Sequence, residues 1–151
     1  MSSTDRIEKK KLLRAPRARV FRALTDAQEF GAWFRVKLEG EMVPGAHVRG
    51  QITSPGFEHL TMQMWVEALE PESRFAFRWH PYALDPNVDY SKEPTTLVEF
   101  TLFDEGGGTL LTIVESGFDA IPAARRAKAF EMNSEGWAIQ SDRIERYVDA
   151  P

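Results

Sequence analysis

The spacing of hydrophobic and polar residues changes along the chain, and each change predicts a different kind of element. Residues 7–14 mix polar and apolar side chains and end just before Pro16, which predicts a first strand. Beyond Pro16, apolar residues recur at helical spacing, and Asp26 can cap a second short helix. We therefore expect one strand followed by two short helices in tandem.

The middle of the chain alternates apolar and polar residues, which is the pattern of half-buried strands. The alternation is clearest over residues 74–80, and it recurs over residues 97–102 and after the glycine-rich turn at 104–108. Residues 47–52 and 60–69 predict two further strands. Consecutive strands joined mostly by short turns favour an antiparallel sheet, and five or six of them in a row would curl strongly.

One connection in this region is much longer than the others. Residues 81–94 contain three prolines together with Asp85, Asn87 and Asp89, a composition that disfavours both helix and strand. Loops of this length inside compact domains often act as lids or binding loops.

The last quarter of the chain predicts one long helix over residues 119–148, with Asp119 as a candidate cap. Its inner face carries apolar, aromatic and amide residues three or four apart: Phe130, Asn133, Trp137, Gln140, Ile144, Tyr147 and Val148. Charged residues occupy the opposite face, where we expect Arg125, Arg126 and Lys128 to be solvated, like the run Lys9–Lys11. Such a helix needs a concave sheet to cover it, and any space that side chains leave unfilled there is a pocket.

Composition narrows the classes of function. The chain has 151 residues, of which 42% are hydrophobic and 28% charged, as in ordinary soluble globular proteins. The net charge of −4 argues against nucleic-acid and anionic-membrane partners. The absence of cysteine excludes disulfides and thiolate chemistry, and three histidines are too few for a His-rich metal site. We expect no metal and no cofactor.

The N-terminus lacks the apolar core of a signal peptide, and no apolar run approaches the ~18–20 residues of a membrane span. The expected location is the cytoplasm.

Several short motifs together resemble the heat-shock-protein-90 ATPase activator homologue family. They are Arg19-Val20-Phe21-Arg22-Ala23-Leu24-Thr25-Asp26, Ala32-Trp33-Phe34, Gly107-Gly108-Thr109, Glu115-Ser116-Gly117-Phe118 and Gly136-Trp137. The resemblance covers residues 5–149 as a single domain of the START-like (SRPBCC, helix-grip) superfamily. It implies an α+β helix-grip (START-like, Bet v-like) fold, in which a curved antiparallel sheet wraps around the long C-terminal helix and leaves a cavity between them. Such a fold hosts many functions.

Two departures from the family pattern bear on function. The eukaryotic co-chaperones of this family carry a separate N-terminal domain, whereas this chain starts at the first strand. Gln140 and Ser141 stand where the family has aliphatic residues, which suggests a cavity with some polar lining.

The candidate ligand-binding residues are those that the predicted elements direct toward the cavity. They are Trp33, Phe34, Phe77, Trp79, Phe100, Glu115, Asn133, Trp137 and Gln140. For each of them, ordinary core packing is the competing interpretation, and the aromatic residues supply large apolar area in either case.

Two of the polar candidates could carry chemistry. Glu115 continues the inward alternation of its strand, and a carboxylate facing a cavity would be a general base with a raised pKa. Because its strand is about to end, however, we expect Glu115 to be exposed. His80 and Tyr82 could form a proton relay at the cavity mouth, although a histidine at a strand end is expected at the surface.

The favoured function is the binding of a small apolar or aromatic ligand in the cavity. One alternative is a co-chaperone-like protein that acts on a heat-shock chaperone ATPase, and another is a cyclase- or hydrolase-type enzyme that uses a cavity acid. No dedicated catalytic set is visible, which disfavours the enzyme. An exposed sheet edge would also allow a homodimer.

Overall fold

The elements follow the predicted order in a computed structural model, which describes residues 5–85 and 87–149. In chain order they are β1 (Arg6–Leu13), α1 (Arg17–Thr25), α2 (Ala27–Phe34), β2 (Val36–Glu39), β3 (His47–Ile52), β4 (Thr61–Glu70), β5 (Arg74–Trp79), β6 (Thr96–Glu105), β7 (Gly108–Ser116), the 3₁₀ turn η1 (Phe118–Ala120) and α3 (Ala123–Asp149).

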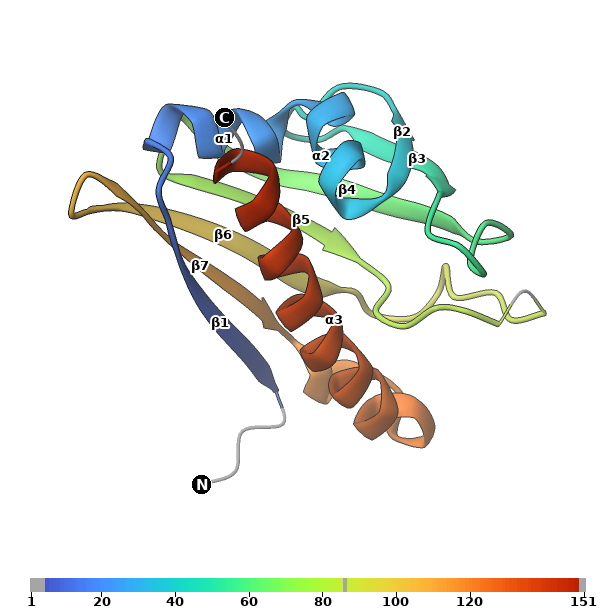
Figure 1. Ribbon diagram of the computed structural model, residues 1–151. Coiled ribbons are helices and arrows are strands. Elements are labelled where there is room, and N and C mark those ends of the chain that lie inside the picture. Colours follow the sequence, from blue (N-terminus) through green and yellow to red (C-terminus); the bar gives the residue numbers. More distant parts are fainter. Residues whose placement is uncertain (1–4, 86, 150–151) are drawn as a thin grey trace.

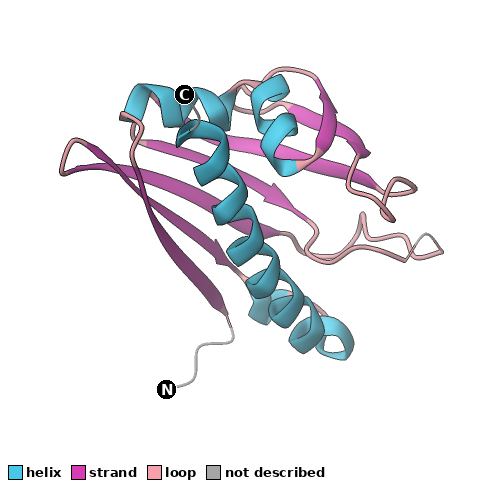
Figure 2. Cartoon of the chain, in the orientation of Figure 1, coloured by secondary structure: helices cyan, strands magenta, loops and turns pink. Residues whose placement is uncertain are grey.

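The strands form one antiparallel sheet in the order β1-β7-β6-β5-β4-β3-β2. The sheet curves around α3, which runs obliquely across it, while α1 and α2 lie beside the C-terminal end of α3 (Figure 1). All three helices lie on the same side of the sheet, and the long loop between β5 and β6 extends past the strands (Figure 2). The predicted α+β helix-grip architecture is confirmed.

Strand β2 was not predicted, and two glycines explain how it fits. A Cβ atom on Gly31 of α2 would lie 2.2 Å from the Val36 carbonyl oxygen, and one on Gly50 of β3 would lie 1.9 Å from the Lys37 carbonyl oxygen. The β2 backbone therefore packs directly against both glycines. The position of β2 depends on these close approaches. Its four residues are too few to show the alternation of apolar and polar side chains that identifies a strand in the sequence.

The two helix starts differ in how well the sequence predicted them. The Asp26 side chain accepts hydrogen bonds from the backbone N–H groups of Gln28 and Glu29, each 3.0 Å long, so the predicted cap is confirmed. The long helix begins at Ala123 rather than at Asp119, and η1 precedes it. Because Pro122 disfavours helical conformation in the residue before it, the helix begins only after this proline.

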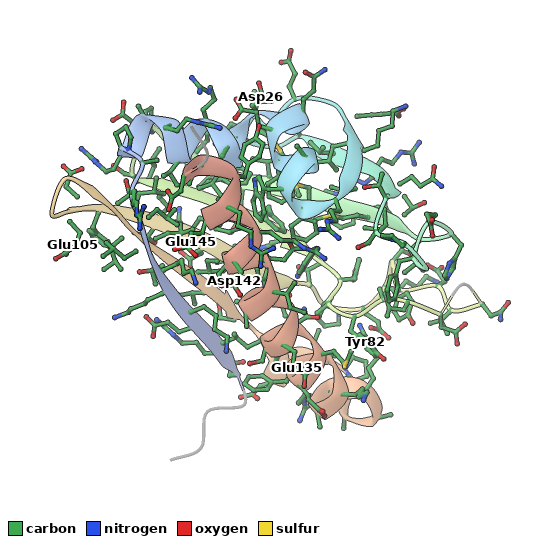
Figure 3. All side chains as sticks on the ribbon, in the orientation of Figure 1. Asp26, Tyr82, Glu105, Glu135, Asp142 and Glu145 are labelled. Atoms are coloured by element: carbon green, nitrogen blue, oxygen red, sulfur yellow. The ribbon has the colours of Figure 1, made fainter. Side chains whose placement is uncertain are left out.

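Charged and polar side chains attach the C-terminal helix to the rest of the chain. The Lys11 ammonium lies 2.6 Å from Asp142 and 3.4 Å from Glu145, both on the side of α3 toward β1 (Figure 3). The hydrogen bond that Lys11 donates to Asp142 raises the pKa of Lys11. Lys11 was expected on a solvated face, but α3 lies over β1 and supplies its partners. Near the C-terminus of α3, the Tyr147 hydroxyl donates to Glu29 of α2 over 3.1 Å.

Replacing each of two glycines by alanine tests these packing relations. Gly50→Ala should lower the free energy of unfolding by about 1–3 kcal/mol, because the new methyl group meets backbone atoms of β2. Gly136→Ala is the control within α3: its Cβ would meet nothing within 4 Å, and helix propensity should raise the free energy of unfolding by about 0.5–1 kcal/mol. Urea denaturation measures both, and a neutral Gly50→Ala would contradict the account of β2.

Candidate functional site

Glu115 is the most unusual side chain in the structure, because it is a completely buried carboxylate. It lies near the end of β7 and is 0% exposed. The expectation that it would be exposed is wrong, since α3 passes over the end of β7 and covers it. Strand alternation had correctly placed the side chain on the inner face.

Four uncharged side chains donate hydrogen bonds to the Glu115 carboxylate. Its Oε1 accepts from Trp137 Nε1 at 2.8 Å and from Asn133 Nδ2 at 3.0 Å. Its Oε2 accepts from Trp79 Nε1 at 2.7 Å, Thr96 Oγ1 at 2.5 Å and Asn133 Nδ2 at 3.1 Å. Indole and amide N–H groups can only donate, so three of the four partners match an acceptor-only carboxylate, whereas the Thr96 hydroxyl can donate or accept.

Two physical effects act on Glu115 in opposite directions. Burial disfavours the charged form and raises the pKa of Glu115 above its ordinary value, and this is the larger effect. The hydrogen bonds from Thr96, Trp79, Trp137 and Asn133 favour the charged form and reduce that rise.

The two indoles bound to Glu115 belong to a cluster of aromatic rings. The ring centres of Trp79 and Trp137 are 5.6 Å apart, and Phe34 of α2 lies 6.2 Å from the first and 6.0 Å from the second. Behind them, Phe77 packs 5.4 Å from Trp79 and Phe100 packs 5.7 Å from Trp137. Five of the predicted site residues therefore meet around the buried carboxylate.

A pocket of about 580 Å³ opens beside this cluster, bounded by the middle of α3, β4 and the loop after β5. Its lining includes Phe34, Met62, Trp65, Trp79, His80, Tyr82, Leu84, Val88, Tyr90, Met132, Asn133, Gly136 and Gln140. A smaller hollow of about 90 Å³ is lined by Phe34, Trp79, Asn133, Gly136, Trp137 and Gln140. Because all but Trp137 also line the larger pocket, the hollow adjoins it.

The predicted site residues fall into three groups. Those that line the pocket or the adjoining hollow are Phe34, Trp79, Asn133, Trp137 and Gln140. Glu115 lies behind this lining. The third group, Trp33, Phe77 and Phe100, is buried in the core, and the Trp33 indole donates to the Ala23 carbonyl over 2.8 Å.

Several lining residues were not nominated from the sequence. Trp65, Met132 and Gly136 are examples, together with residues of the long loop such as Tyr90. The length of the loop indicated a lid or a binding loop, so its apolar side chains could have been nominated on that argument. Gly136 was another signal of the pocket. Glycine is unfavourable inside a helix, so its presence there indicates a neighbouring space that a side chain would fill.

Arg125 holds the long loop against α3. Its guanidinium donates to the Pro81 carbonyl over 2.7 Å and to Glu93 over 2.9 Å, and it stacks over the Tyr90 ring with a carbon-to-centroid distance of 4.9 Å. Arg125 was expected on a solvated face, but only 18% of its side chain is exposed. The loop supplies the partners that sequence periodicity could not show.

His80 is half-buried in the pocket wall rather than fully at the surface, and it packs edge-on against Trp65 with ring centres 5.5 Å apart. Burial lowers the pKa of His80, which favours its neutral form at pH 7. His80 Nδ1 is buried without a hydrogen-bond partner among the described residues, so the proposed relay to Tyr82 is not assembled through that atom in this conformation.

Neither a metal site nor a membrane span is found in the part of the chain that the structure describes. No group of three or more His, Cys, Asp or Glu side chains there could hold a metal ion. None of its helices is both long and apolar enough to cross a bilayer.

The curved sheet around a long helix, with a pocket between them, places the protein in the helix-grip class. Residues 14–149 match the family described as Activator of Hsp90 ATPase homolog 1-like protein, and the chain belongs to that family. No curated protein matches it.

Solved structures confirm the fold. DynU16, a protein of the dynemicin biosynthetic locus, is 25% identical with a TM-score of 0.73; the match covers 97% of this chain but only 48% of DynU16. MLL2253 from Mesorhizobium loti is 22% identical with a TM-score of 0.75, over 95% of this chain and 96% of that one. The Aha1 dimer from Colwellia psychrerythraea is 16% identical with a TM-score of 0.72, over 96% of each chain.

The state of Glu115 can be measured directly. Carbon-13 NMR of the glutamate side chains should show one carboxyl, absent in Glu115→Gln, that titrates above the ordinary pKa of about 4.3. The raised pKa means that the folded state binds the proton more tightly than the unfolded state. The free energy of unfolding of the wild type, relative to Glu115→Gln, should therefore fall as the pH rises from about 4.3 through the folded-state pKa. A midpoint at or below about 4.3 would contradict this.

Proposed function

We propose that this protein binds a small, largely apolar molecule in the pocket between α3 and the loop that follows β5. The observation that carries this proposal is the pocket itself. Its volume of about 580 Å³ falls within the range of about 300–1,000 Å³ that is typical of ligand sites. Aromatic and methionine side chains dominate its lining, and a few amides and hydroxyls can orient a ligand.

The family and fold support the same proposal. Helix-grip proteins enclose space between sheet and helix, and a structural neighbour of this chain, DynU16, comes from the dynemicin biosynthetic locus. The proposed location is the cytoplasm, where such a carrier or sensor would meet metabolites.

A cavity acid is not part of this proposal. The general base of a cyclase or hydrolase must come within hydrogen-bond reach of the reacting atom. Glu115 lies behind Trp79 and Asn133, and both of its oxygens already accept hydrogen bonds from protein groups. Its contacts support a role in holding the pocket wall in place.

A substitution that fills the pocket tests the proposal. N-phenyl-1-naphthylamine, a neutral fluorophore that brightens in apolar surroundings, should bind the wild type saturably. Gly136→Leu places a side chain into the space beside Gly136 and should weaken binding at least about tenfold, because the leucine competes for the same volume. Glu135→Leu adds the same side chain at the exposed neighbouring position on α3 and should bind like the wild type (Figure 3).

Circular dichroism verifies that both variants fold. A wild type that fails to bind the fluorophore saturably, or a folded Gly136→Leu that binds as well as the wild type, would contradict the proposal.

A heat-shock chaperone ATPase is a second candidate partner, and only the family's description favours it. If this chain acts on the chaperone, adding it to a bacterial Hsp90-type protein should raise the rate of ATP hydrolysis several-fold in a coupled assay. Gly136→Leu should then stimulate as well as the wild type, since the pocket is not the contact surface. An unchanged rate would reject this candidate.

A homodimer, which the Colwellia neighbour forms, would be seen by sedimentation equilibrium of the same samples.

A further inference from the structure

The hollow beside the pocket is lined by a residue whose hydrogen-bond acceptor has no donor among the described residues. Gln140 Nε2 donates to the Phe34 carbonyl over 3.2 Å, which fixes the orientation of the amide because only nitrogen can face that oxygen. Within the described residues, Gln140 Oε1 is buried and has no hydrogen-bond partner. Leaving a buried acceptor without a hydrogen bond costs about 1–3 kcal/mol. We therefore expect a donor from outside the chain to bind at this atom.

Asn133 presents a second acceptor at the same place. Its Nδ2 donates to both oxygens of Glu115, so Oδ1 is the amide atom left for another partner. Asn133 and Gln140 both line the hollow and the larger pocket.

Aromatic rings form the other walls of the hollow. The rings of Trp79, Trp137 and Phe34 line it, and both indole N–H groups donate to the Glu115 carboxylate. A hydrogen bond to an anionic acceptor pushes electron density into an indole, and tryptophan faces already attract cations more strongly than other rings. Whenever Glu115 is ionised, its charge adds to this attraction from behind the rings, in surroundings of low dielectric constant.

The charged groups of the lining also favour a positively charged ligand. Asp89 lines the larger pocket, and the pKa of His80 is lowered by burial, which favours its neutral form. No lysine or arginine belongs to the lining among residues 5–85 and 87–149. The lining itself thus offers no cationic side chain to an anionic ligand, whereas a cation would find acceptors, aromatic rings and Asp89.

We propose that the hollow between Phe34, Trp79 and Trp137 holds the positively charged amino group of a ligand whose apolar body fills the larger pocket. The volume of about 90 Å³ is about three times that of a water molecule in the liquid, which suits an ammonium head. The substrate class is thus an apolar or aromatic organic amine. This inference rests on the proposed function and specifies its ligand.

Three naphthalene derivatives that differ mainly in charge test the inference. Calorimetry at pH 7 and low salt compares 2-naphthylmethylamine, 2-naphthylmethanol and 2-naphthoate. The amine should bind the wild type at least about tenfold more tightly than 2-naphthoate, with the alcohol between them. Binding of the amine should also shift the NMR signals of the Trp79 and Trp137 indole N–H groups.

Two amide variants locate the effect. Gln140→Leu removes the unpaired acceptor and should weaken binding of the amine about tenfold, while affinity for 2-naphthoate changes little. Gln63→Leu removes an exposed amide at the pocket rim, where Gln63 pairs with His47, and should keep the preference for the amine. The indole shifts in the wild type serve as a second readout should Gln140→Leu fail to fold.

The outcomes separate this inference from the proposed function. If the three compounds bind equally, or 2-naphthoate binds best, the amine subsite is overturned while the pocket stands. Unshifted indole signals on amine binding, or an unchanged amine preference in a folded Gln140→Leu, would overturn the assigned location. If none of the three compounds binds and N-phenyl-1-naphthylamine fails as well, the proposed function itself falls.

Discussion

The burial of one carboxylate constrains the rest of the structure. A carboxylate removed from water is tolerated only when hydrogen bonds replace its hydration. Glu115 obtains them from β5, β6 and α3 through Trp79, Thr96, Asn133 and Trp137, so these elements must meet in one register. The same bonds fix two indoles and an amide as a rigid wall. The polar interaction that brings helix and sheet together therefore also shapes the hollow beside the pocket.

The pocket exists because side chains attach α3 to the rest of the fold at several points and leave the helix uncovered at a point between them. Lys11 ties the helix to β1, and Tyr147 ties its C-terminal end to α2. Arg125 binds the long loop near the start of the helix. Between these attachments, Gly136 contributes no side chain to fill the gap. Contacts on both sides of the hollow thus fix the position of α3, and the hollow does not result from loose packing.

The strongly periodic elements could be predicted from the sequence, because strand alternation and helical spacing are local properties. The Asp26 cap was predictable for the same reason. Strand β2 was not, since its place is set by how closely backbone can approach Gly31 and Gly50. Alternation showed which way Glu115 points but could not show that α3 covers it. The partners of Arg125 were also invisible, because a helical wheel identifies a polar face and not what packs against it.

The central claim is that this fold keeps an open, preformed space lined by Trp79, Asn133 and Gln140. A high-resolution crystal structure of the protein purified from its host, with no apolar additive, tests it most directly. We expect a hollow at the described place that contains density for an organic molecule or for ordered water. A pocket closed by collapsed side chains of the long loop and of Met132, with Gln140 Oε1 bonded within the protein, would contradict the account.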